Sequence, residues 1–407
     1  MSGAADTVER EEEASQEVFE PPRWTFVAML IAVAATSPLG INVYLPSMPG
    51  MAQAFEVDFA TIQLTLSLYL AAVAVGQLVL GPLSDYFGRR PVLLAGLSAF
   101  IVGTVICLLA PNIGVLLFGR VVQALGGCAG IVLSRAAVRD LYGRDQAASM
   151  IGYVTMGMAV APMLAPSIGG GLEAIYGWRA SFVFLLLFGG VALLAAFRLL
   201  YETNPQRGAE RSVAQMLREY GELARSRVFW GYALTTGFST AVFFCFVAGA
   251  SFVTIEQMGR SPLEYGLYFA LVPAGYMVGN FLSGRFAHRY GADRLVLRGC
   301  LVIAAGVAAM MVMLALGWLH PAALFGPMFV VGIGNGLVIP SGVAGAVSVK
   351  PQIAGAASGL SGSVQMGFGA LVAPLVGALL AASAWPMVIV MGACAVLALL
   401  AFAAAQR

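Results

Sequence analysis

The chain has 407 residues, of which 60% are hydrophobic and only 10% are charged, and its mean hydropathy is +0.87. A soluble domain carries about 25% charged residues, so this composition excludes an ordinary soluble domain and predicts a membrane protein. The formal net charge of +2 gives no indication of a nucleic-acid partner. The first 22 residues are polar and mostly acidic where charged, whereas a signal peptide begins with a basic region. We therefore interpret residues 1–22 as a disordered cytoplasmic tail.

Twelve apolar stretches follow the tail, and each is long enough to cross a bilayer as a helix, which takes about 20 residues. The spans are predicted at 24–46, 61–84, 91–110, 114–137, 147–170, 180–201, 229–254, 265–284, 295–317, 322–347, 353–380 and 384–404. The short alternating segments of a transmembrane barrel are absent from the sequence. We therefore expect an all-α integral membrane protein with twelve transmembrane helices.

Basic residues indicate how these spans are oriented. If the N-terminus is cytoplasmic, all 22 Lys and Arg residues except Arg120, Arg179 and Arg260 fall on the cytoplasmic side. An excess of positive charge in the cytoplasmic loops is the usual pattern in membrane proteins. This distribution predicts an even number of spans in an inner (plasma) membrane, with both termini in the cytoplasm.

One long polar interruption, residues 202–228, divides the chain into six-span halves at 23–201 and 229–407. We interpret it as a cytoplasmic linker that is partly an amphipathic helix. The halves also match each other when the sequence is shifted by about 203 positions: Gly76, Gly81 and Gly88 fall on Gly279, Gly284 and Gly291, and Gln77 falls on Asn280. Matching glycines at equivalent places predict two six-helix pseudo-repeats, an architecture that transporters use, with a substrate site between the halves.

The most specific motif is the loop after the second span, Gly81-Pro82-Leu83-Ser84-Asp85-Tyr86-Phe87-Gly88-Arg89-Arg90-Pro91. Gly81 is expected to let a neighbouring helix approach closely. Asp85 is expected to pair with Arg89 or Arg90, or to meet the positive end of another helix. Such a latch can form in one state and break in another, so we predict a conformational gate at Gly81, Asp85, Gly88, Arg89 and Arg90.

Two spans carry unusual groups. Arg120 is the only charged residue deep in a predicted span, and burying it costs at least about 2.5–3.5 kcal/mol. It is expected either to face a water-filled cavity or to bond to backbone carbonyls.

In the fifth span, Pro162 and Pro166 lie one turn apart and each removes a backbone donor. With Gly169 and Gly170 they predict a kinked, closely packed helix, although a proline kink is also an ordinary feature of transmembrane helices.

The loop resembles the signature loop of the major facilitator superfamily, of form G-x-L-x-D-x-x-G-R-R/K. Arg120-Val121-Val122-Gln123-Ala124-Leu125-Gly126-Gly127 is similar to that family's fourth-span pattern, and Ala161-Pro162-Met163-Leu164-Ala165-Pro166-Ser167-Ile168-Gly169-Gly170 is similar to the fifth-span motif of its antiporters. Three further stretches resemble the Bcr/CflA branch of drug:proton antiporters: 43–49, 63–69 and 177–179. The resemblance implies a cavity-facing Arg120, a fifth helix that favours antiport, and a monomer.

One position departs from that branch. Proton-coupled relatives typically place an acid in the first span just before Tyr-Leu-Pro, whereas this chain has Asn42, which cannot titrate. No other acid lies deep in a predicted span. Asp85, Asp140 and Asp145 lie at cytoplasmic ends, and Glu56, Asp58, Glu173, Glu256 and Glu264 lie on the outer side. Proton coupling would then use an end-of-helix acid such as Asp85 or Asp140, or a carboxylate of the substrate.

The leading hypothesis is a secondary transporter that exports small amphiphilic drugs or metabolites, as a substrate:proton antiporter. The alternative is a transporter of a specific neutral or anionic metabolite, because an unpaired cavity arginine favours such ligands over organic cations. The residues expected to line the cavity are Asn42, Tyr44, Gln63, Tyr69, Arg120, Gln123, Asn280, Asn335 and Gln365. No enzyme activity, cofactor or metal site is expected, because the sequence holds two scattered histidines and five cysteines at unrelated spacings.

Overall fold

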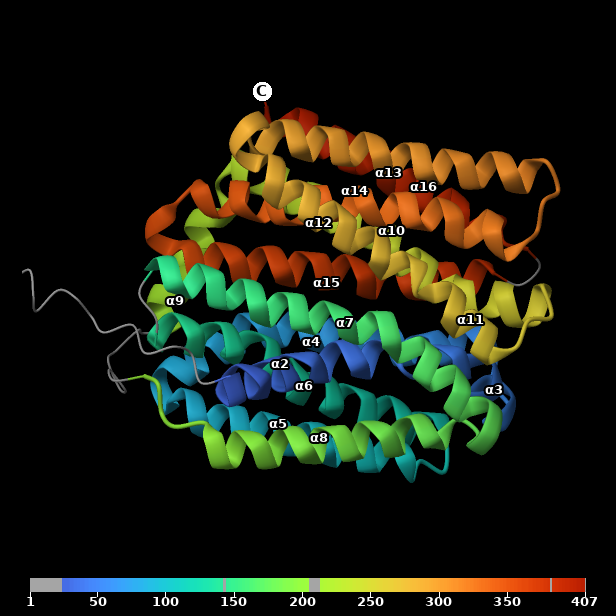
Figure 1. Ribbon diagram of the computed structural model, residues 1–407, viewed down its shortest axis with the longest axis horizontal. Helices are drawn as coiled ribbons and strands as arrows, with labels where there is room; N and C mark the ends of the chain where they lie inside the picture. Colours follow the sequence, from blue (N-terminus) through green and yellow to red (C-terminus); the bar gives the residue numbers. More distant parts are fainter. Residues whose placement is uncertain (1–23, 142–143, 205–212, 381–382, 407) are drawn as a thin grey trace, which may run out of the picture.

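The computed structural model describes residues 24–141, 144–204, 213–380 and 383–406 (Figure 1). Within these ranges every regular element is a helix, which confirms the predicted all-α class. The predicted tail at 1–22 lies outside the described residues, as does the stretch 205–212 of the predicted linker.

The first half contains α2 (Trp24–Asn42), η1 (Leu45–Ser47), α3 (Met48–Ala54), α4 (Phe59–Phe87), α5 (Arg89–Leu108), α6 (Ile113–Leu141), α7 (Arg144–Tyr176) and α8 (Arg179–Leu199). The linker contains α9 (Val213–Ala224). The second half contains α10 (Arg227–Phe252), η2 (Val253–Gln257), α11 (Pro262–Phe269), α12 (Leu271–Tyr290), α13 (Ala292–Ala315), α14 (Pro321–Ser348), η3 (Pro351–Ile353), α15 (Ala354–Leu379) and α16 (Trp385–Ala405). Of the described helical segments, ten are long and apolar enough to cross a membrane by themselves; α7 and α11–α12 complete the twelve.

Two predicted spans are broken where the prediction had continuous helices. The first span ends as an α-helix at Asn42 and continues through η1 into α3. The eighth is divided at Ala270 into α11 and α12. Pro273 explains the second break, because it has no N–H to bond the carbonyl of Phe269 one turn earlier.

The internal repeat is visible in the backbone. Gly88 separates α4 from α5 with φ +100°, and Gly291 separates α12 from α13 with φ +78°. Both values lie in the region that favours glycine. Gly76 faces α6 through Cys128, while Gly279 faces α14, the equivalent helix of the second half. The two halves therefore repeat the same helix contacts.

The structure contradicts one packing prediction. A Cβ placed on Gly81 would meet no atom within 4 Å, and the same holds for its counterpart Gly284. These glycines therefore do not permit a close helix approach in this structure. The close approaches lie elsewhere, as at Gly103 and Gly126, where a Cβ would overlap the backbone of the neighbouring helix.

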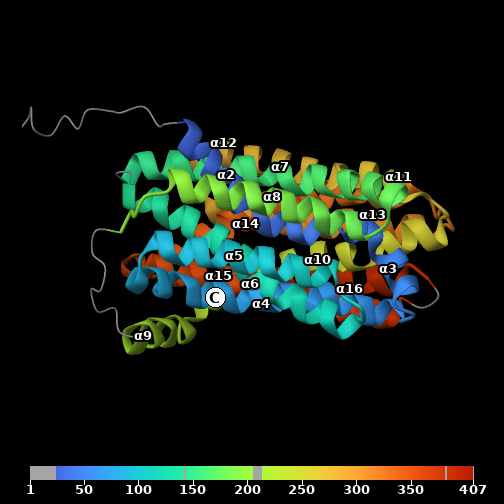
Figure 2. The same ribbon diagram turned by 90° about the horizontal axis from the view of Figure 1, so that it is seen from below.

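The two halves lie side by side with parallel helix axes and meet along two seams (Figure 1). One seam joins α4 to α15, and the other joins α7 to α11 and α12. Helix α9 lies outside the bundle, at the predicted cytoplasmic end (Figure 2). Its Leu223 is buried while its Arg218 is exposed, so the linker does contain the predicted amphipathic helix.

Candidate functional site

The side chain of Arg120 is fully buried between α2, α4 and α6. Its guanidinium carbon lies 4.1 Å from the ring centre of Tyr44 and 4.3 Å from that of Tyr69. A planar guanidinium can stack on an aromatic ring through each of its faces, which a lysine ammonium cannot do in the same way. The two tyrosines therefore fix the plane of the guanidinium.

The edge of the guanidinium is bonded to neutral oxygens. Nη1 donates to the carbonyl of Gly40 at 2.9 Å and to Oε1 of Gln123 at 2.6 Å, and Nε donates to the carbonyl of Thr65 at 3.3 Å. Gln123 in turn donates to the hydroxyl of Thr104 at 2.8 Å. Nη2 is buried without a hydrogen-bond partner among the described residues. The charge of Arg120 thus has no carboxylate beside it in the described part of the chain.

Three of the residues predicted to line a cavity therefore meet Arg120, namely Tyr44, Tyr69 and Gln123. Asn42 lies two residues beyond Gly40 on the same chain segment. Its side chain is buried, with Nδ2 donating to the carbonyl of Pro38 at 2.8 Å and with Oδ1 left without a hydrogen-bond partner among the described residues. At the position where the resemblance implies an acid, this chain therefore places a neutral amide with one free acceptor.

The other predicted cavity residues lie apart from this cluster. Gln63 donates from Nε2 to the carbonyl of Ala248 and so joins α4 to α10 across the two halves. Gln365 accepts a hydrogen bond from the hydroxyl of Thr240 at 3.4 Å. Asn335 is buried in α14, and Asn280 is half-buried in α12. Among the described residues, none of these four amides bonds to Arg120.

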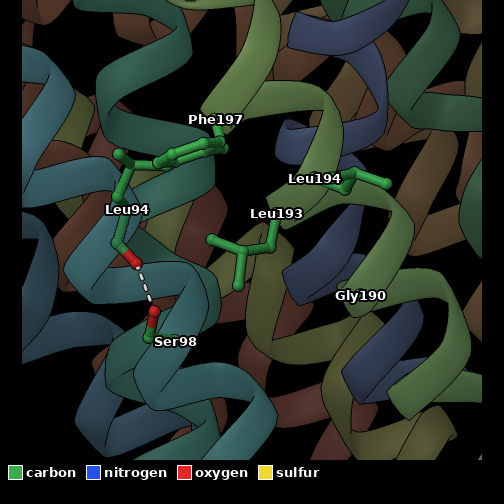
Figure 3. Close-up of a pocket in the computed structure, with 6 residues that line it drawn as sticks. All are labelled: Leu94, Ser98, Gly190, Leu193, Leu194 and Phe197. Carbon is green, nitrogen blue, oxygen red and sulfur yellow. Dashed lines mark hydrogen bonds between the residues drawn. The ribbon is translucent and has the colours of Figure 1, made fainter.

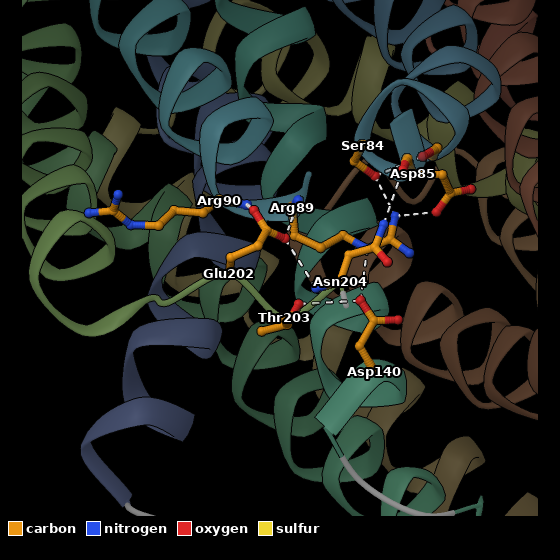
Figure 4. A network of polar contacts seen from close by, with 9 residues as sticks. Ser84, Asp85, Arg89, Arg90, Asp140, Glu202, Thr203 and Asn204 are labelled. Carbon is orange, nitrogen blue, oxygen red and sulfur yellow. Dashed lines mark hydrogen bonds and ion pairs between the residues drawn. The ribbon is translucent and has the colours of Figure 1, made fainter. Parts of the chain in front are cut away.

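The loop Gly81–Pro91 is organised around Arg89 (Figure 4). Its Nη1 lies 2.5 Å from a carboxylate oxygen of Asp85 and donates to the hydroxyl of Ser84 at 2.6 Å, while its Nε donates to Asp140 at 2.8 Å. Asp140 lies at the end of α6, so this one side chain joins α4, α5 and α6. The predicted pairing of Asp85 with Arg89 is present, and Asp140 adds a second carboxylate.

Residues of the predicted linker also bond to this loop, which the sequence did not predict. Glu202 accepts hydrogen bonds from the backbone N–H groups of Arg89 at 2.8 Å and Arg90 at 3.2 Å, at the first turn of α5. A carboxylate is favoured there because these N–H groups have no partner inside the helix. Asn204 donates to the carbonyl of Asp85 at 3.0 Å. No local pattern marks these residues, since they follow the sixth span more than a hundred positions after the loop.

Gly170 of the fifth span and Gly266 of the eighth form a close contact at the end of the molecule opposite the Arg89 network. A Cβ on Gly170 would overlap the carbonyl of Pro262, and a Cβ on Gly266 would overlap the carbonyl of Pro166. The hydroxyl of Ser167 donates to the carbonyl of Gly266 at 2.9 Å. These contacts join α7 of one half to α11 of the other, so the predicted close packing of this helix is present at the interface between the halves.

The carboxyl group of Glu173 lies near this contact and forms no ion pair among the described residues. Glu173 is half-buried, and its Oε2 has no hydrogen-bond partner among the described residues. A Cβ on Gly50 would lie 2.8 Å from its Oε1, so the carboxyl packs against the start of α3. Glu173 lies three residues beyond the predicted span 147–170, and burial raises the pKa of its carboxyl above the ordinary value.

Comparisons with known proteins identify the class to which this arrangement belongs. The model of the Major Facilitator Superfamily matches residues 30–366. The chain therefore belongs to the major facilitator superfamily, a family of transporters rather than enzymes.

The relatives specify the branch. The chain is 32% identical over 380 residues to the bicyclomycin resistance protein homolog of Haemophilus influenzae, covering 93% of this chain and 95% of the relative. It is 34% identical over 359 residues to the chloramphenicol resistance protein of Pseudomonas aeruginosa, covering 86% and 83%. It is 33% identical over 385 residues to the MFS-type transporter YdgK of Bacillus subtilis, covering 93% and 95%. The predicted resemblance to the Bcr/CflA drug exporters is confirmed.

A solved structure supports the same fold. The inward-facing, occupied structure of a bacterial homolog of the human lysosomal transporter Spinster superposes with a TM-score of 0.69, covering 95% of this chain and 97% of that chain. The sequence identity is 18%, so the match concerns the fold alone. The prediction of a twelve-helix major facilitator fold is confirmed.

Proposed function

We propose that this transporter exports small amphiphilic molecules from the cytoplasm by alternating access, as a monomer in an inner membrane with both termini in the cytoplasm. Relatives named for resistance to bicyclomycin and chloramphenicol support the substrate class. The excess of basic residues in the even-numbered connections supports the orientation. Two features support alternating access: the α7–α11 contact joins the two halves at one end of the molecule, and the Arg89 network orders the loop between α4 and α5 of the first half at the other end.

The proposed coupling is substrate:proton antiport through a carboxyl group outside the first span. Asn42 occupies the position of the usual acid and cannot bind a proton. Asp85 and Asp140 are both engaged by Arg89, so their protonation would weaken the network that joins α4, α5 and α6. Glu173 is the further candidate, because its carboxyl is half-buried beside the α7–α11 contact and its pKa is raised by burial.

The observation that carries the substrate preference is the environment of Arg120. Its buried guanidinium is bonded to carbonyl and amide oxygens, with no carboxylate in contact among the described residues. Uncompensated positive charge in a poorly solvated site repels cations and favours an anionic or neutral group. This supports a second candidate function, transport of a specific neutral or anionic metabolite, in which coupling is altered or absent.

Flux into proteoliposomes with and without an imposed pH gradient separates the two candidates. If the protein is an antiporter, a gradient that is acidic on the side from which protons enter will drive substrate against its concentration gradient. If it is a facilitator, the flux will follow the substrate gradient and will not change with the pH gradient. Failure of the reconstituted protein to move any amphiphile, whether anionic, neutral or cationic, would contradict both candidates.

A further inference from the structure

An apolar groove lies between α5 and α8 on the outside of the first half (Figure 3). Its volume is about 450 Å³, and its lining consists of Leu94, Ser98, Gly190, Leu193, Leu194 and Phe197. The hydroxyl of Ser98 donates to the carbonyl of Leu94 at 2.8 Å, so the one polar side chain of the lining is already bonded within its own helix. Leu194 is 50% exposed and Phe197 is 61% exposed, which places the groove at the surface that contacts lipid.

Gly190 gives the groove its depth. A Cβ at this position would meet no atom within 4 Å, so the glycine leaves open space instead of allowing a close helix contact. Gly189 behaves in the opposite way, since a Cβ there would lie 2.9 Å from the ring of Phe100. The adjacent glycines therefore have different roles, and only Gly190 belongs to the open surface.

Two arginines, Arg90 and Arg198, lie at one end of the groove. Arg90 lies one turn before Leu94 in α5, and Arg198 lies one turn after Leu194 in α8, so both fall on the predicted cytoplasmic side of the lining. Arg90 donates to the carbonyls of Leu200 at 2.8 Å and Phe197 at 3.1 Å, which holds its guanidinium at the mouth. Arg198 is exposed and makes no hydrogen bond or ion pair among the described residues.

We propose that the groove binds an acyl chain of an anionic phospholipid whose phosphate lies between Arg90 and Arg198. An apolar lining with no free polar side chain suits a hydrocarbon chain. Basic groups between transmembrane helices on the cytoplasmic side suit an anionic headgroup. A soluble phosphate would use the arginines alone, whereas a zwitterionic lipid would use mainly the groove. An anionic lipid uses both.

Native mass spectrometry of the full-length protein in detergent tests the proposal, with phosphatidylglycerol, phosphatidylcholine of the same chains and glycerol phosphate as the probes. We expect phosphatidylglycerol to be retained several-fold more than phosphatidylcholine. Arg198→Gln should lower that preference about fivefold, since a basic group near an anionic surface contributes about that factor. Gly190→Leu should reduce the retention of both lipids by filling the groove.

Arg225→Gln is the matched control, because Arg225 is also exposed and cytoplasmic by prediction but lies in the linker. It should leave the lipid preference unchanged. Equal retention of the two lipids by the wild type would overturn the proposal. An equal loss in Arg198→Gln and Arg225→Gln would also overturn it, by indicating a general charge effect, and so would displacement of the lipid by glycerol phosphate, which would indicate a site for free phosphate.

Discussion

The guanidinium of Arg120 lies 4.1 Å from the ring centre of Tyr44 and thereby ties the fourth span to the break in the first. Because the hydroxyl of Tyr44 also lies 3.2 Å from that of Thr65, the same contact reaches the second span. This cluster links three helices of the first half through a charge that no carboxylate among the described residues neutralises. The proposed preference for neutral or anionic substrates rests on this charge.

Replacing Arg120 tests the stacking directly. Arg120→Lys keeps the charge but loses two guanidinium–ring contacts, each of which contributes about 0.5–2 kcal/mol. We expect the variant to lose about 1–4 kcal/mol of stability, measured as thermal denaturation in detergent. Arg298→Lys is the control, because Arg298 stacks on Tyr290 at 4.4 Å but is exposed. Equal stability losses in the two variants would contradict a special role for the buried cluster.

Because Arg89 and Asp140 share one contact, substitutions at the two residues should have non-additive effects on stability. Asp140→Asn should slow transport and lower stability by about 1.5–3 kcal/mol, the usual contribution of a hydrogen bond to a charged group. The effects of Asp140→Asn and Arg89→Gln should not add, because both break the 2.8 Å contact. Asp58→Asn provides the control, since an asparagine can still cap α4 as Asp58 does. Additive losses in the double variant would argue against the network.

The α7–α11 contact is close enough that adding a single methyl group should disturb it. A Cβ at Gly266 would overlap the carbonyl of Pro166, so Gly266→Ala should force the two halves apart at that end and reduce the transport rate. Gly326→Ala should instead stabilise the protein by about 0.5–1 kcal/mol, because its Cβ would enter open space within a helix. The separation is measured as the accessibility of a cysteine introduced at the α7–α11 seam. Unchanged accessibility in Gly266→Ala would contradict the prediction.

Glu173 should make the stability of the protein depend on pH, in a direction set by the shift of its pKa. Burial raises that pKa, so the native protein binds the proton more tightly than the unfolded chain does. Stability should therefore fall as the pH rises above the ordinary carboxyl range of about 4.3 and through the raised pKa. Glu173→Gln should remove this loss, as measured by thermal denaturation over a pH series. The same slope in the variant and the wild type would assign the pH dependence to another group.

Much of the fold follows from local properties of the sequence. Runs of apolar residues located the spans. The sequence limited the partner of Asp85 to Arg89, Arg90 or a helix end, and the structure shows the ion pair with Arg89. Glu202 and Asn204 could not be predicted as partners of the loop, because the loop lies more than a hundred positions earlier in the sequence. The residues alone left the surroundings of Arg120 open between a water-filled cavity and backbone carbonyls, and the family resemblance implied a cavity. In the structure the side chain is instead fully buried and bonded to carbonyl and amide oxygens, an outcome that depends on the packing of three helices.

The most direct test of the account is a flux series in proteoliposomes with amphiphiles that are matched in size but anionic, neutral or cationic. The wild type should move the anionic and neutral compounds and exclude the cation. Asn42→Asp should admit the cation, because a carboxylate near Gly40 would offset the charge of Arg120. Accumulation of the organic cation by the wild type against its gradient, to the same extent as the anion, would contradict the account.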